Sequence, residues 1–125
     1  MPAAAGVSQA STFDSWDSVK AFAMALPGAE ESTSYGRPTV RIRSKPIVYP
    51  TREPESFAIA ASLDEKQFLI ETDPNTFWDS AHFSGWPAVL VRYGSAERER
   101  IETVIRRAWW DRLSKAQQRE FGERP

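Results

Sequence analysis

The stretch TVRIRSKPIVYPTREPESFAIAAS, residues 39–62, decides the fold. In TVRIR, the apolar residues Val40 and Ile42 alternate with Arg41 and Arg43. This period of two is typical of a strand that buries one face and exposes the other. SKP then predicts a turn, and IVYPT and SFAIAAS predict two more strands. Several short strands joined by tight turns favour an antiparallel sheet.

Helices are expected on both sides of this strand region. Asp14 or Ser15 can cap a first helix that runs to Leu26, where a Pro-Gly pair ends it. Towards the other end, Ser95 can cap a long helix with apolar residues at helical spacing. AVLVRY, residues 88–93, is apolar on both faces and should lie centrally under a helix. The sequence therefore predicts an α+β fold in two layers, with an N-terminal helix, an antiparallel sheet of about five strands, and a long C-terminal helix packed on the sheet.

Length and composition indicate one domain that can bury its own core. The chain has 125 residues, of which 41% are hydrophobic and 26% are charged. The opening MPAAAGVSQAS is small and polar, so we predict a flexible tail over residues 1–12 and a single domain over residues 13–122. This opening lacks the features of a secretory signal, and no run of about 18 apolar residues occurs. We expect a cytoplasmic protein without membrane contact.

Motifs for catalysis are missing from the sequence. The chain has no cysteine, no nucleophile elbow and no glycine-rich phosphate loop. His82 is the single histidine, and a metal site would have to add carboxylates such as Asp79. A backbone hydrogen bond beside a turn is the favoured role of His82, and Glu30-Glu31 is interpreted as a solvated turn. We therefore predict no enzymatic activity, no cofactor and no metal.

Positive charge is concentrated in two segments, although the net charge is only -1. Residues 37–52 carry five basic residues and no acid. Arg41 and Arg43 on one strand, Lys45 in the turn and Arg52 on the next strand could form a basic ribbon that lies along phosphates. The alternative is that these side chains only solvate an exposed sheet face, as charge runs usually do.

The tryptophans have two possible roles. Trp86 stands between Gly85 and Pro87, and we predict that it anchors this turn against the sheet. A fully exposed Trp86 would instead indicate stacking with nucleic-acid bases. Of Trp109 and Trp110 on the last helix, at least one is expected in the core.

Two segments carry a series of spaced motifs: ALPGAEESTSYGRPTVRIRSK, residues 25–45, and DPNTFWDSAHFSGWPAVLVR, residues 73–92. The motifs are L-P-G-x-x-E, then Y-G-x-P before a basic strand, then D-P-x-x-F, H-F-x-G-W-P and a V-L-V strand. In this order they resemble the MmcQ/YjbR-like family of small bacterial proteins, over about residues 13–110.

The resemblance implies a helix, an antiparallel sheet and a second helix, as in secretion chaperones, and a DNA-binding role of the double-wing type. Its wing-like hairpin falls on Arg41, Arg43 and Lys45. Its signature positions are Tyr35, Gly36, Pro38, His82, Gly85, Trp86 and Pro87.

These observations predict a non-catalytic, sequence-tolerant DNA-binding protein that contacts phosphates through a basic hairpin. The predicted contacts are Arg41, Arg43, Lys45, Arg52 and Arg92. The alternative prediction is a protein-interaction module, chaperone-like or dimerising, that uses the sheet face or the C-terminal helix for a protein partner or a second copy.

Overall fold

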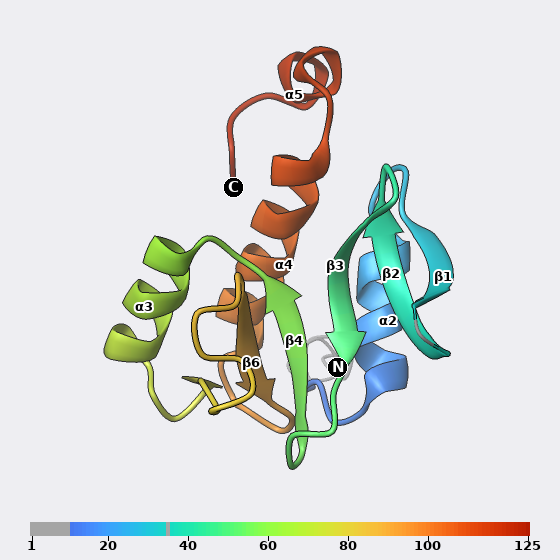
Figure 1. Ribbon diagram of the computed structural model, residues 1–125. Helices are drawn as coiled ribbons and strands as arrows, with labels where there is room; N and C mark the ends of the chain where they lie inside the picture. Colours follow the sequence, from blue (N-terminus) through green and yellow to red (C-terminus); the bar gives the residue numbers. More distant parts are fainter. Residues whose placement is uncertain (1–10, 35) are drawn as a thin grey trace, which may run out of the picture.

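The computed structural model describes residues 11–34 and 36–125, and within them six strands form one antiparallel sheet (Figure 1). The strands are β1 (Glu30–Ser34), β2 (Arg37–Ile42), β3 (Lys45–Pro50), β4 (Ser56–Ala60), β5 (Phe77–Trp78) and β6 (Ala88–Arg92). Their order in the sheet is β1-β2-β3-β4-β6-β5. The predicted α+β class and antiparallel sheet are confirmed. The predicted solvated turn at Glu30-Glu31 is wrong, because these residues begin β1 and pair with Arg41 and Val40.

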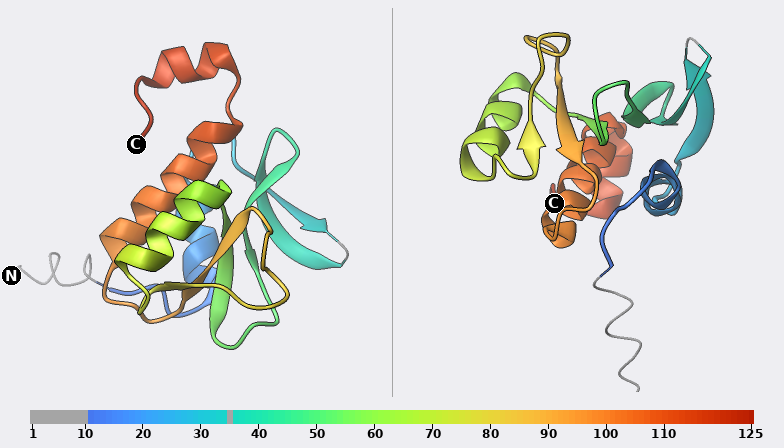
Figure 2. Two further views of the ribbon diagram at one scale, coloured as in Figure 1. Left: turned by 60° about the vertical axis from the view of Figure 1, so that its left-hand side comes forward. Right: turned by 90° about the horizontal axis from the view of Figure 1, so that it is seen from below.

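Four helices accompany the sheet in the described part of the chain: α2 (Trp16–Met24), α3 (Leu63–Thr72), α4 (Arg98–Arg112) and α5 (Lys115–Phe121). Helices α2 and α4 lie on one face of the sheet, and α3 flanks its β5 edge beside α4 (Figure 2). The predicted cap of the first helix is confirmed, since the Ser15 side chain accepts a hydrogen bond from the Ser18 amide. None of these helices has the length and apolar character that crossing a bilayer requires.

The main hydrophobic core lies between the sheet and the helices. Val40 and Ile42 are buried there, as their alternation with arginines predicts. Val89 and Val91 of β6 point to the same core, whereas Ala88 and Leu90 belong to a smaller cluster on the other face. β6 is therefore buried on both faces, as predicted.

The second face of β6 is covered by a loop rather than by a helix. The chain between β5 and β6, residues 79–87, crosses this face and is here called the signature loop (Figures 1 and 2). Phe83 of this loop is 8% exposed and packs on Ala58 and Leu90. Beyond the loop, on the side of β2 and β3, no helix of the described chain covers this face (Figure 2).

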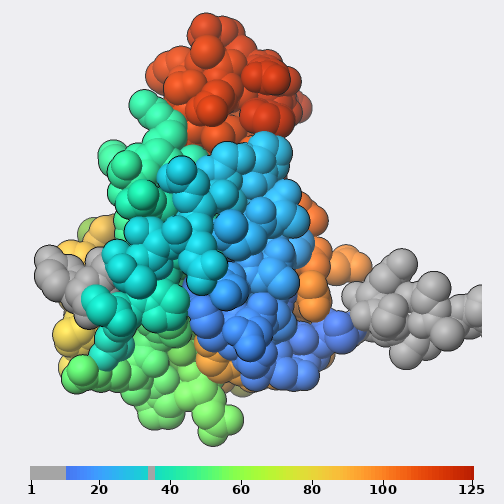
Figure 3. Space-filling view, turned by 90° about the vertical axis from the view of Figure 1, so that its right-hand side faces the viewer, coloured from blue at the N-terminus to red at the C-terminus, as the bar shows by residue number. Residues whose placement is uncertain are grey.

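The predicted long C-terminal helix is divided in two. Leu113 adopts an extended conformation, with φ -71° and ψ 155°, and ends α4. Ser114 and Gln117 then form a capping box that starts α5, because each side chain bonds the backbone amide of the other. Figure 3 shows α5 at one end of the molecule, next to the turn between β2 and β3.

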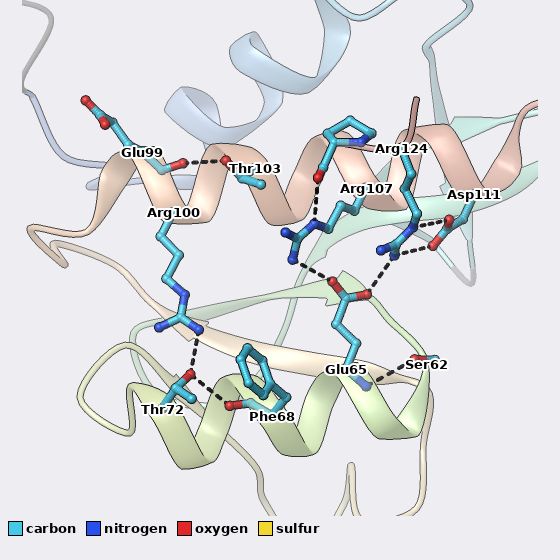
Figure 4. A network of polar contacts seen from close by, with 11 residues as sticks. Ser62, Glu65, Phe68, Thr72, Glu99, Arg100, Thr103, Arg107, Asp111 and Arg124 are labelled. Carbon is cyan, nitrogen blue, oxygen red and sulfur yellow. Dashed lines mark hydrogen bonds and ion pairs between the residues drawn. The ribbon is translucent and has the colours of Figure 1, made fainter. Parts of the chain in front are cut away.

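A polar network joins the last residues to α3 and α4 (Figure 4). The Glu65 carboxylate of α3 pairs with Arg107 of α4 at 3.3 Å and with Arg124 at 3.0 Å. Arg124 also contacts Asp111 at 2.8 Å. The Glu65 side chain is 13% exposed, so it is the most buried member of these pairs. The network fixes the direction in which the chain returns after α5.

Candidate ligand-binding cleft

A cleft with a volume of about 690 Å³ lies on the sheet face opposite α2 and α4. Its walls come from β2, β3, the turn between β3 and β4, and the signature loop. They include Arg37, Pro38, Thr39, Tyr49, Arg52, Glu53, His82, Phe83 and Trp86. The cleft thus combines aromatic surface with two guanidinium groups and one carboxylate.

The β2 wall follows from strand alternation. Thr39 and Val40 point to opposite faces, so Val40 enters the helix-side core while Thr39 and Arg37 border the cleft. The buried Thr39 hydroxyl donates to the Val48 carbonyl at 3.2 Å and holds β2 against β3. Of the predicted signature positions here, Pro38 lines the cleft and Gly36 precedes β2 with a φ of 78°. Tyr35 lies outside the described residues.

A buried lysine holds the signature loop. The Lys66 side chain of α3 is only 5% exposed, and its ammonium donates to the carbonyls of Phe83 and Trp86 at 2.7 and 3.0 Å. The same ammonium pairs with Asp79 at 3.0 Å. Our sequence prediction did not include Lys66. Two features of the sequence could have indicated Lys66. It is the single basic residue in residues 53–91, which carry seven acids, and it lies three positions before the buried Leu69.

Trp86 does not anchor the turn as predicted. Its side chain is 58% exposed, and the buried Phe83 takes the place on the sheet instead. The loop turns at Gly85, whose φ of 77° lies in the left-handed region that favours glycine. Pro87 follows, and its carbonyl accepts a hydrogen bond from Ala61 at 3.1 Å. The backbone of the loop is therefore fixed while the indole of Trp86 faces solvent at the cleft.

His82 also lines the cleft and is exposed. Its ring meets the edge of Phe83 with centroids 5.4 Å apart. The predicted hydrogen bond from His82 to the backbone is not formed with any residue in 11–34 or 36–125. Within the same residues, no group of three His, Asp or Glu side chains is placed to hold a metal ion.

The basic residues of the predicted ribbon divide between the β2–β3 hairpin, which carries Arg41, Arg43 and Lys45, and the turn after β3, which carries Arg52. Arg41 pairs across the sheet with Glu30 at 3.5 Å. Arg43 lies in the turn between β2 and β3 with a φ of 50°, and it donates to the Arg112 carbonyl at 3.4 Å. Lys45 is exposed at the start of β3.

Arg52 does line the cleft, and so does Arg37, which was not among the predicted site residues. Arg52 lies in the turn after β3 and lines the cleft together with Arg37 at the start of β2. Arg92, at the end of β6, places its guanidinium 4.8 Å from the centre of a Trp78 ring. The structure thus brings together Arg37 and Arg52 and leaves Arg41, Arg43 and Lys45 outside the cleft walls.

Tyr49 is a partly buried tyrosine that lines the cleft. Burial raises the pKa of the Tyr49 hydroxyl above its ordinary value of 10.0, an effect that the neighbouring Trp86 side chain partly offsets. Tyr49 therefore offers a neutral hydroxyl and an aromatic ring at neutral pH. Chemically, the cleft can stack a planar ring and pair an anion with guanidinium groups.

Comparison with solved structures defines the class of fold. The crystal structure of Deinococcus radiodurans protein DR2400, which contains the domain DUF419, matches with a TM-score of 0.64. The match covers 88% of this chain and 89% of DR2400, at 15% sequence identity. The two proteins therefore share an α+β fold.

The family follows from the sequence comparison. The YjbR family model matches residues 24–110, so this chain belongs to the YjbR family and the predicted resemblance is confirmed. The uncharacterized proteins Mb2600 of Mycobacterium bovis and Rv2570 of Mycobacterium tuberculosis are each 42% identical to it over 41 residues. These matches cover 33% of this chain and 32% of each relative.

Proposed function

We propose that this protein binds DNA without catalysis and that guanidinium groups at the cleft contact its phosphates. The observation that carries the proposal is that Arg37, Arg52 and the exposed Trp86 border one cleft on the sheet face that no described helix covers. Arginine pairs with phosphate through a planar fork of donors, and exposed tryptophan stacks on bases. The hairpin residues Arg43 and Lys45 would then be secondary contacts, because they lie outside this cleft.

The proposal agrees with the charge distribution. Net charge is -1, so the overall charge of the molecule does not attract DNA, which is itself negative. The local excess of five basic residues over residues 37–52 supplies the positive potential instead, and both cleft arginines belong to that segment. Affinity should therefore depend on a few contacts and fall as salt rises.

Fluorescence anisotropy tests the proposal with labelled single-stranded and duplex DNA over a salt series. We expect saturable binding and a linear fall of log affinity with log salt. The double variant Arg37→Ala plus Arg52→Ala should bind more weakly. On a single strand, the steepness of its salt line should decrease by about 0.7 for each phosphate that the variant no longer neutralises. The matched control is Arg119→Ala, which removes an exposed arginine on α5 outside the cleft walls. It should change neither the affinity nor the steepness of the salt line.

Two outcomes would contradict the proposal. The first is no binding at tens of micromolar protein in low salt, because non-specific DNA binders reach roughly that range. The second is an unchanged salt line in the Arg37 and Arg52 double variant. A loss confined to Arg43→Ala plus Lys45→Ala would assign the phosphate contacts to the hairpin, as the sequence alone predicts.

The protein-interaction module is the second proposal. Phe121 favours it, because this aromatic residue is 43% exposed and belongs to α5, the helix at one end of the molecule (Figure 3). Light scattering at several protein concentrations tests dimerisation. Phe121→Ser should lower the apparent mass if α5 joins two copies, and an unchanged monomer in both proteins would rule this arrangement out.

A further inference from the structure

We propose that the cleft captures a single unpaired nucleobase, so that its ligand is single-stranded or locally unpaired DNA rather than intact duplex. The inference rests on the proposed function and names the part of the nucleic acid that enters the site. Three features of the cleft support it: its size, its aromatic lining and its charged lining residues.

The size of the site is that of a small-molecule site. Its volume of about 690 Å³ lies within the range of about 300–1,000 Å³ that is usual for small-molecule sites. In a duplex the faces of every base are covered by their stacked neighbours, and only an unpaired base offers a free face to a protein side chain. A concave site of this size therefore receives a base that has left the stack.

The aromatic rings are placed to meet such a base. Trp86 is 58% exposed, and Tyr49 and the largely buried Phe83 line the same cleft. Although Trp86 is exposed, its backbone is held, because the Lys66 ammonium binds its carbonyl at 3.0 Å and its amide donates to Phe83 at 2.9 Å. A ring whose backbone is already fixed loses little freedom on binding, and this favours stacking.

The charges favour one nucleotide over a continuous phosphate track. Arg37 and Arg52 each offer a guanidinium group, but Glu53 lies beside Arg52 in the same wall. A carboxylate repels a row of phosphates, whereas it can accept hydrogen bonds from base amino groups. The arrangement therefore fits a base inside the cleft and its flanking phosphates at the two arginines.

The test compares a short labelled single strand with an abasic strand of the same length, which keeps the phosphates and lacks the bases. Binding of both is measured by anisotropy in the same low-salt buffer, with the duplex as a third ligand. We expect the abasic strand to bind about 5- to 150-fold more weakly, the range that stacking of one base contributes. The duplex should also bind more weakly than the base-bearing strand.

Trp86→Ala should lose the preference for the base-bearing strand, whereas Trp86→Phe should keep most of it because a phenyl ring still stacks. Phe68→Ala is the matched control, since Phe68 on α3 is 57% exposed and lies outside the cleft walls. It should bind both strands as the unmodified protein does. Because Trp86 is largely exposed, its replacement should not destabilise the fold. Equal urea midpoints for all variants will show that folding is intact.

The outcomes separate this inference from the proposed function. Equal affinity for the base-bearing and abasic strands, with a normal salt dependence, would overturn base capture and leave phosphate binding in place. A preference for bases that survives Trp86→Ala would also overturn it. Failure of every strand to bind would refute both the proposed function and the inference that rests on it.

Discussion

Replacing Lys66 by methionine removes the ammonium that holds the signature loop and keeps a side chain of similar length. In the native protein this ammonium donates hydrogen bonds to the carbonyls of Phe83 and Trp86 at 2.7 and 3.0 Å. It also forms an ion pair with the Asp79 carboxylate at 3.0 Å. The variant leaves all three acceptors without this donor. We expect it to be less stable than the unmodified protein.

The magnitude follows from the environment of each acceptor. A hydrogen bond to a charged donor contributes about 1.5–3 kcal/mol, and the variant cannot form two such bonds to carbonyls. The Asp79 side chain is 34% exposed and can be hydrated in the variant, so loss of its ion pair adds little to the destabilisation. The apolar methionine avoids the cost of burying an ammonium, which offsets part of the loss. We therefore expect a decrease of about 3 kcal/mol in the free energy of unfolding, or about 10 °C in midpoint temperature.

Urea unfolding followed by circular dichroism measures this change. Lys115→Met, at an exposed lysine on α5, is the matched control and should stay within about 0.5 kcal/mol of the unmodified protein. Asp79→Asn should cost less than Lys66→Met, because the two carbonyls keep their donor. A stability of Lys66→Met equal to that of Lys115→Met would refute the conclusion that the ammonium holds the loop.

Three further predictions concern the turn, a buried tyrosine and the C-terminal network. Gly85→Ala should lower the free energy of unfolding by about 1 kcal/mol because of its positive φ of 77°, although no atom of the described residues lies within 4 Å of the added methyl group. An unchanged urea midpoint would contradict this. Burial raises the pKa of Tyr93 from 10.0 to about 12. The unfolded chain therefore ionises first, and stability should be complete below pH 10 and fall between pH 10 and about 12. Urea midpoints of Tyr93→Phe should decline less over that interval, and parallel curves would exclude the effect. Glu65→Gln weakens the ion pairs with Arg107 and Arg124 and should lower the free energy of unfolding by about 1 kcal/mol, and by less in high salt. A loss of stability that does not change with salt would show that charge is not the cause.

Much of the sheet could be predicted from sequence because several of its strands carry a local pattern. The alternation of Val40 and Ile42 with arginines and the doubly apolar AVLV segment are local signals, and both agree with the observed burial. β1 was missed because Glu30 and Glu31 are both charged, so no alternation marks them as a strand. The break between α4 and α5 was missed although Ser114 and Gln117 have capping-box spacing, because a continuous helical pattern suggested one helix.

The candidate site was less predictable because it depends on contacts between distant segments. Arg37 and Arg52 are 15 positions apart and meet through the pairing of β2 with β3. Trp86 was expected to pack on the sheet because a large aromatic side chain between glycine and proline usually anchors a turn. Phe83 occupies that place, and a choice between two aromatic residues of one loop is decided by packing rather than by local sequence.

The one-sided arrangement of α2 and α4 has a consequence for how such a protein can change over evolutionary time. Most of the core residues lie on the helix side of the sheet, whereas the cleft residues lie on the other side. Mutations in the cleft walls can therefore accumulate while the packing of the helices is preserved. Proteins that share this fold at 15% identity, as this chain and DR2400 do, can diverge in what they bind without diverging in architecture.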